Sequence, residues 1–195
     1  MMTDVSMNLS NETLTILKNF ATINSNILFP KGNIIKTISP MKNIMATATI
    51  SEDFESEFGI WDLNKFLGTI SLFKSPSFSF MDDYMMIEDK GSSVKYYYSD
   101  PRLLTVANKD VNMPAPVVSF ELTNSVFSEI MKASSVLQLS DLCVRSNGSS
   151  IELVAVDKTD VTSNNYSVEV GNNESQSEFT FYFKSENLKI LQGDY

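Results

Sequence analysis

Four lysines recur at matching places in the four helices that the hydrophobic periodicity predicts. Each lies in the middle or the C-terminal half of its helix, and they are Lys18, Lys65, Lys132 and Lys189. A row of ammonium groups on one surface could bind the phosphates of a nucleic acid without reading its bases. Lysine is also common near helix C-termini and on solvated helix faces, where it interacts favourably with the helix dipole. Composition alone favours this ordinary explanation, so both interpretations stay open at this point.

The residue types that most enzymes need are missing from the sequence. The chain has no histidine and one cysteine, Cys143, which excludes Ser-His-Asp and Cys-His catalysis, an intrachain disulfide, and zinc or iron–sulfur clusters. Its glycines are not spaced as in a phosphate-binding loop. The acidic segments 52–57 and 82–83 are typical of a solvated strand face and not of a Mg²⁺ or Ca²⁺ loop. We therefore predict no enzyme activity, no metal and no cofactor.

The charge balance qualifies the nucleic-acid interpretation. The 195 residues include 15 basic and 24 acidic side chains, which gives a net charge of −9. Nucleic-acid-binding proteins usually carry a basic surface, but lysines gathered on one face and acids on strands and loops would reconcile this charge with a polyanionic partner. The sequence shows no signal peptide, and no stretch approaches the ~20 apolar residues of a membrane span. We expect a chain without a membrane partner in a reducing cytoplasm.

Hydrophobic periodicity predicts a chain dominated by strands, with four short helices among them. Alternation of apolar and polar residues predicts strands over residues 33–39, 44–50, 54–60, 93–98, 117–122, 151–157, 166–170 and 178–183. Helical spacing of apolar residues follows four candidate N-caps, which are Ser10, Asp62, Thr123 or Asn124, and Ser185.

The order of these elements repeats, which predicts two similar domains. Strand, helix, strands and helix occur once before residue 100 and begin again after residue 116. We predict an α+β fold with domain 1 over residues 1–107, a polar, proline-containing linker over 108–116, and domain 2 over 117–195, each domain with two short helices on one face. The first copy continues through further strands after its second helix, whereas the second stops at Tyr195. We therefore expect the second domain to lack its C-terminal strands.

Two segments closely resemble the DNA polymerase sliding clamps, or processivity factors, of T-even and related tailed bacteriophages: Leu17-Lys18-Asn19-Phe20-Ala21-Thr22-Ile23-Asn24-Ser25 and Asp62-Leu63-Asn64-Lys65-Phe66-Leu67-Gly68. Weaker similarity continues through the linker to residues 188–195, so the resemblance spans essentially the whole chain.

The resemblance implies a DNA-clamp fold and a role in viral DNA replication. Such clamps are ring-shaped homotrimers that a clamp-loader ATPase places on duplex DNA, where they hold the replicative DNA polymerase and serve late transcription. Helices line the channel and sheets form the outer wall, which assigns DNA-facing roles to the four lysines. Lys132 stands where relatives have an arginine, and Ser135 stands where a second basic residue can occur. The expected location is the cytoplasm of the infected bacterial host.

A head-to-tail ring needs two different surfaces that join neighbouring subunits. We predict that a short apolar strand of Leu103, Leu104 and Val106 pairs with the strand that carries Tyr166 and Val168. Clamp-binding proteins of this family use a partly hydrophobic peptide that docks near the linker. The candidate pocket residues are Met113, Pro114 and Val117, although packing of the linker against a domain would explain these apolar residues equally well.

Two other classes of function remain open from the residues alone. A non-enzymatic phage structural or decoration protein would also be acidic, rich in strands and free of histidine, but it would need no row of lysines. A small hydrolase would need two carboxyl groups on facing elements. DNA binding together with a size measurement separates the three classes.

Overall fold

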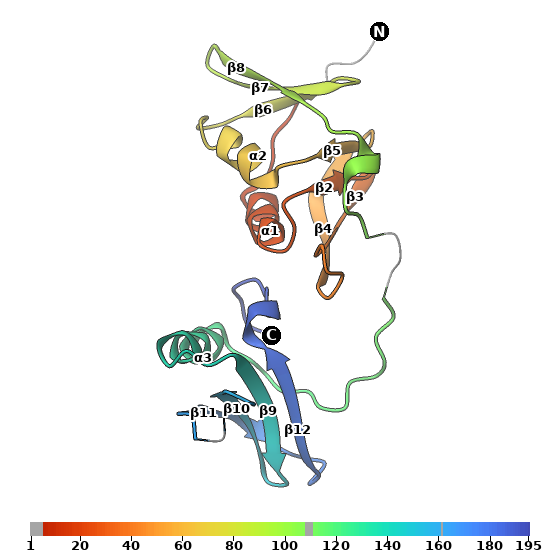
Figure 1. Ribbon diagram of the computed structural model, residues 1–195. Helices are drawn as coiled ribbons and strands as arrows, with labels where there is room; N and C mark the ends of the chain where they lie inside the picture. Colours follow the sequence, from red (N-terminus) through yellow and green to blue (C-terminus); the bar gives the residue numbers. More distant parts are fainter. Residues whose placement is uncertain (1–5, 108–110, 161) are drawn as a thin grey trace. The chain divides into compact units, whose positions relative to one another are not determined.

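The computed structural model describes residues 6–107, 111–160 and 162–195. Its contacts divide the chain into two compact units, residues 1–111 and 112–195 (Figure 1). The division lies inside the predicted linker, of which residues 108–110 are outside the described residues. Each unit is described by itself below.

The described residues of unit 1 form two α-helices and eight strands. The helices are α1 (Asn11–Ala21) and α2 (Leu63–Ile70), followed by a 3-10 turn, η1 (Pro101–Leu103). The strands are β1 (Ser6–Met7), β2 (Ile27–Phe29), β3 (Gly32–Ile38), β4 (Met45–Phe54), β5 (Phe58–Ile60), β6 (Ser77–Phe80), β7 (Tyr84–Asp89) and β8 (Ser92–Tyr97). They form one sheet in the order β1-β6-β7-β8 and two antiparallel pairs, β2-β5 and β3-β4.

The two helices of unit 1 pack against each other, side by side (Figure 1). On α1 the buried positions follow helical spacing, with Ile16, Leu17 and Phe20 directed into the core. Aromatic rings fill the space between the helices and the strands: Phe29 stacks on Phe58 at 4.6 Å between ring centroids. A further ring contact, between Phe66 and Tyr96, joins α2 to β8. Burial of these apolar faces is what fixes the two helices on the sheets.

The described residues of unit 2 form a single four-stranded sheet covered by one α-helix. Its elements are α3 (Asn124–Val136), β9 (Asp141–Asn147), β10 (Ser150–Val156), β11 (Tyr166–Asn172), β12 (Glu178–Lys184) and the 3-10 turn η2 (Ser185–Asn187). All neighbours in the order β11-β10-β9-β12 are antiparallel. Helix α3 packs on β10 and β11 (Figure 1), and Ile130 from the helix is fully buried in the core with Leu153 and Ala155.

The strand pairing supports the internal repeat. In unit 1, β3 pairs with β4 and β2 pairs with β5. In unit 2, β10 pairs with β11 and β9 pairs with β12. In both units, therefore, the second and third strands after the first helix pair with each other, and the first strand pairs with the fourth. Unit 2 adds a ladder between β9 and β10, which joins the two pairs into one sheet.

Two predicted elements are wrong. Residues 117–122 do not form a strand. Val118, Phe120 and Leu122 nevertheless pack on the unit 2 core, as the alternation predicted. Among the described residues, however, only Leu122 has a ladder-like partner, because it exchanges both backbone hydrogen bonds with Tyr195. The predicted strand 54–60 is interrupted, since β4 ends at Phe54 and β5 begins at Phe58.

The fourth predicted helix is also wrong. Residues 185–187 form only the 3-10 turn η2, which has no side-chain hydrogen bond at its N-cap, and an irregular segment follows. In unit 1, α2 packs against α1 and contacts β8 through Phe66 and Tyr96. The described part of unit 2 offers no sheet equivalent to β6-β7-β8 against which a second helix could pack. Across residues 112–160 and 162–195, unit 2 therefore has one α-helix and not the predicted two.

Candidate nucleic-acid interface

Lys18 lies on the exposed face of α1 because the opposite face is buried. The helix begins at the predicted cap, Ser10, whose hydroxyl accepts a hydrogen bond from the N–H of Thr13. Glu52 on β4 reinforces this end: one carboxylate oxygen accepts from the Ser10 N–H and the other from the Thr13 hydroxyl, each at 2.5 Å. These contacts fix the start of α1 on the sheet, so the direction of Lys18 follows from the helical spacing.

Glu52 is 6% exposed, and both of its carboxylate oxygens accept hydrogen bonds in this network. Burial alone would raise its pKa, but the hydrogen bonds from Thr13 and Ser10 to the ionised form outweigh burial. The pKa of Glu52 is therefore lowered from its ordinary value. The negative charge also lies at the N-terminus of α1, where the helix dipole favours it.

Lys65 occupies the corresponding place on α2. The predicted cap Asp62 accepts from the N–H of Lys65 at 2.9 Å, and the buried residues Leu63, Phe66 and Ile70 place the lysine side chain on the exposed face. Because α1 and α2 are neighbours, Lys18 and Lys65 come from adjacent helices of one unit.

Lys132 is the lysine of unit 2 that lies on an α-helix. Thr123 caps α3 through a hydrogen bond from the Val126 N–H to its hydroxyl. Ile130 and Ser134 mark the buried side of the helix, and Lys132 is exposed between them. Within the described ranges, Lys18, Lys65 and Lys132 have no carboxylate within salt-bridge distance. Their charges are thus available to a polyanion.

Lys189 was predicted on a helix, but it lies in the irregular segment after η2. Lys189 is exposed, as the other three lysines are, but they lie on α-helices and it does not. The nearby Lys184 contributes to structure instead: its ammonium lies 2.9 Å from the carboxylate of the buried Asp141. Burial would raise the pKa of Asp141, but hydrogen bonds from Ser140 and Lys184 and the Lys158 N–H outweigh it, so the pKa is lowered.

The described residues hold no group of three His, Cys, Asp or Glu side chains that could bind a metal ion. None of the helices in those same ranges is long and apolar enough to cross a membrane.

The predicted interface strand at 103–106 is wrong. Asp100 and Pro101 begin η1 instead, because the Asp100 carboxylate accepts from the Arg102 N–H and proline suits the first position of a helical turn. Leu103 is exposed, but Leu104 is buried in unit 1. Its Cδ1 would lie 2.7 Å from a Cβ added to Gly59, so Leu104 packs against β5 and is not available to a second subunit.

The other half of the predicted interface lies on an edge strand. Tyr166 and Val168 are half-buried on β11, which pairs only with β10 within the described sheet. The Tyr166 hydroxyl donates to the Glu129 carboxylate of α3. In unit 1 the predicted strand 93–98 is confirmed as β8, but its place in the subunit interface was not predicted: within the described sheets it pairs only with β7, and it exposes Lys95 and Tyr97.

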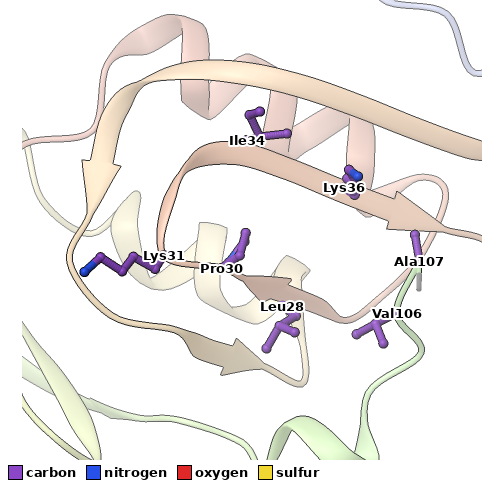
Figure 2. A pocket seen from close by; sticks show the side chains of 7 residues that line it. All are labelled: Leu28, Pro30, Lys31, Ile34, Lys36, Val106 and Ala107. Carbon is purple, nitrogen blue, oxygen red and sulfur yellow. The ribbon is translucent and has the colours of Figure 1, made fainter. Parts of the chain in front are cut away.

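The proposed pocket residues of the linker are exposed. Met113 is 81% and Val117 82% exposed, and Pro114 is exposed between them. These residues are thus not packed into either unit. A separate groove was missed: it lies between β2, β3 and residues 106–107 of unit 1 (Figure 2). Val106, predicted at the subunit interface, lines this groove.

Comparison with known proteins shows the family to which the two units belong. The family described as "DNA polymerase processivity factor" matches residues 10–78, and "gp45 sliding clamp, C terminal" matches residues 119–195. A sliding clamp from Vibrio phage KVP40 is 32% identical over 195 residues, covering 97% of this chain and 88% of that protein. The chain belongs to the phage sliding-clamp family. Clamps from Escherichia phage RB69 and Enterobacteria phage T4 are 29% and 28% identical, each over 97% of this chain and 85% of their own length.

Solved structures confirm the clamp fold. A PCNA from Thermococcus kodakaraensis matches with a TM-score of 0.66 at 10% identity, over 96% of this chain and 86% of that one. The DNA polymerase III subunit beta from Pseudomonas aeruginosa matches with a TM-score of 0.62 at 12% identity, over 97% of this chain and 58% of that one. The predicted α+β clamp fold and the phage sliding-clamp function are confirmed. The chain is a DNA polymerase processivity factor of phage DNA replication.

Proposed function

We propose that this chain is one subunit of a homotrimeric ring that encircles duplex DNA, without catalytic activity of its own. The ring is placed on DNA by a clamp-loader ATPase in the cytoplasm of the infected bacterial host. There it holds the replicative DNA polymerase, and by the same tethering it serves late transcription. The observation that carries the proposal is family membership over 97% of the chain, together with exposed, unpaired lysines on all three described α-helices.

The lysines suit a clamp that must hold DNA and still slide along it. A lysine ammonium is a hydrated point charge on a flexible stem, whereas an arginine makes directional, bidentate contacts with phosphate. Lys18, Lys65 and Lys132 lie on exposed helix faces, and Lys189 adds a fourth exposed cation. Their contacts with phosphate are expected to be independent of sequence and strongly dependent on salt.

Ring assembly is assigned to the free edges of β8 and β11. Each strand has one neighbour in the described sheets, so each leaves a row of backbone donors and acceptors open. Lys95 is exposed on β8 and Glu169 is exposed on β11, so the two edges carry opposite charges. Such pairs stabilise neighbouring strands by about 0.2–1 kcal/mol. Tyr166 and Val168 keep their predicted interface role on β11, whereas β8 replaces residues 103–106.

The tether for partner proteins is assigned to Met113, Pro114 and Val117. Apolar side chains that are this exposed on a connecting segment are available to a docking peptide. Met113→Asp is expected to weaken binding of a peptide from the polymerase C-terminus by about ten-fold while the oligomer stays intact. Val136→Asp, which changes another strongly exposed apolar residue, on α3, is the matched control. Equal affinity in a fluorescence titration would remove this assignment.

Primer extension tests the function as a whole. The phage polymerase copies a primed circular template with the clamp loader and ATP, in the presence or absence of this chain. We expect long products only when the chain is present, and no gain when the loader is omitted. Products of the same length in both reactions would contradict the proposal.

A further inference from the structure

The two charged residues of α3 stand three positions apart on the helix. Glu129 precedes Lys132, and both side chains are exposed. Side chains three or four residues apart are neighbours on a helix surface, and opposite charges at this spacing attract each other. A free carboxylate at Glu129 would therefore draw the Lys132 ammonium away from a phosphate.

The lysines of unit 1 do not meet this difficulty. On α1 the acidic residue, Glu12, stands six positions before Lys18 and so lies on a different side of the helix. Asp62 stands three positions before Lys65, but it is the N-cap of α2, and its carboxylate accepts from the Lys65 N–H at 2.9 Å. A backbone N–H in the first turn has no partner inside the helix, so it is free to bind this carboxylate.

Glu129 has no such backbone donor, because it lies inside α3, where the N–H groups already bind carbonyls one turn earlier. Its donor comes from the sheet: the Tyr166 hydroxyl on β11 donates to Glu129 Oε1. Helix α3 packs on β11, and the Tyr166 ring packs against the unit 2 core, so the hydroxyl is held beside the helix. The hydrogen bond to Glu129 raises the pKa of Tyr166, so the hydroxyl remains a donor at neutral pH.

We propose that Tyr166 is a positioning residue for DNA binding: it holds the Glu129 carboxylate against β11, so that the Lys132 ammonium stays available to phosphate. The inference rests on the DNA-facing role proposed for Lys132 and names the residue that maintains it. Lys132 has no carboxylate within salt-bridge distance in the described part of the chain, although Glu129 stands within one helical turn. The hydrogen bond from Tyr166 accounts for this separation.

The salt dependence of DNA binding tests the inference on the assembled protein. Tyr166→Phe keeps the ring in the core but removes the donor to Glu129, so the freed carboxylate pairs with Lys132. In a trimer this withdraws three lysine contacts, and the slope of log K against log salt concentration is expected to become less steep by about 2–3. The probe is a short fluorescent duplex, and sedimentation sets a protein concentration at which each variant is trimeric.

Glu129→Gln in the Tyr166→Phe background is the rescue variant. It removes the freed charge, so the slope is expected to return to within about 1 of wild type. In the wild-type background the same change is expected to alter the slope by less than about 1, because Tyr166 already holds the carboxylate. A purely structural role of Tyr166 would not give this rescue, since the second substitution restores no packing contact. Tyr182→Phe, which removes an exposed hydroxyl from β12 at the other edge of the described sheet, is the matched control and is expected to keep the wild-type slope.

Lys132→Gln separates this inference from the proposed function. If Lys132→Gln makes the slope less steep but Tyr166→Phe does not, the positioning role is wrong and the DNA-facing assignment stands. A wild-type slope in Lys132→Gln would instead remove Lys132 from the DNA-facing residues, and the positioning role would fall with it. Equal effects of Glu129→Gln in the two backgrounds, or a loss in Tyr182→Phe equal to that in Tyr166→Phe, would also overturn the positioning role.

Discussion

Reversal of Lys18 and Lys132 to glutamate gives the most direct test of the DNA-facing surface. Both side chains are exposed on helices whose opposite faces are buried, so neither substitution removes a packing contact. Neither lysine has a salt-bridge partner among the described residues. The folded subunit is thus expected to tolerate the change, and the effect is confined to the charge presented to DNA.

The expected size of the effect follows from the number of ammonium groups. In the proposed ring, four lysines on each of three subunits would place twelve cations around the DNA, and the double variant would change six of them. Each neutralised phosphate adds about −0.9 to the slope of log K against log salt concentration. With every lysine in contact the slope is about −11, and the variant reduces it to about −5.

Binding of the trimer to a short fluorescent duplex, measured from about 50 to 200 mM salt, gives this slope. The matched control is Lys42→Glu with Lys90→Glu, which changes the net charge equally but lies on the turns after β3 and β7. Sedimentation confirms that each variant remains a trimer, and primer extension reports processivity. A wild-type slope and wild-type product length in the Lys18 and Lys132 variant would refute the channel assignment, and a loss of equal size in the control would show a general charge effect.

Three further predictions test the fold and the assembly. Lys95→Glu is expected to weaken each subunit contact about ten-fold and Glu169→Lys in the same chain to restore it; a sedimentation profile that neither change alters would contradict the β8–β11 pairing. Gly59→Ala places a Cβ 2.6 Å from the Ser99 carbonyl oxygen, so we expect unit 1 to lose about 2 kcal/mol of stability, whereas Gly68→Ala, which meets nothing within 4 Å on α2, is stabilising or neutral in the same thermal melts. Because the pKa of Glu52 is lowered on folding, its ionised form stabilises the fold above about pH 4.3 and this stabilisation is lost as the pH falls through the folded pKa. Glu52→Gln is therefore expected to lose less stability than wild type on acidification in urea titrations, and identical pH dependence would show that the network is not linked to folding.

Local chemistry in the sequence determined the three α-helices and their exposed lysines. Ser10, Asp62 and Thr123 cap these helices through hydrogen bonds to N–H groups within the first turn, which needs no distant contact. The apolar spacing that buries Leu17 or Phe66 also directs Lys18 or Lys65 outward, because both follow from 3.6 residues per turn. The repeat was visible for the same reason, since each copy carries its own caps and periodicity.

Tertiary structure decided the elements whose stability depends on a distant neighbour. Residues 117–122 and 185–191 have the patterns of a strand and a helix, but the described part of unit 2 gives them few partners, and they form irregular segments or a 3-10 turn. Leu104 was predicted at the subunit interface from its apolar neighbours in the sequence, but it is buried in unit 1 against Gly59. The groove between β2, β3 and residues 106–107 arises from segments far apart in the chain. The strand β8 was predicted from its own alternation, but its place at the edge of the described sheet depends on the order of the strands. Strand order and side-chain hydrogen bonds between such segments depend on the folded arrangement, which no local pattern specifies.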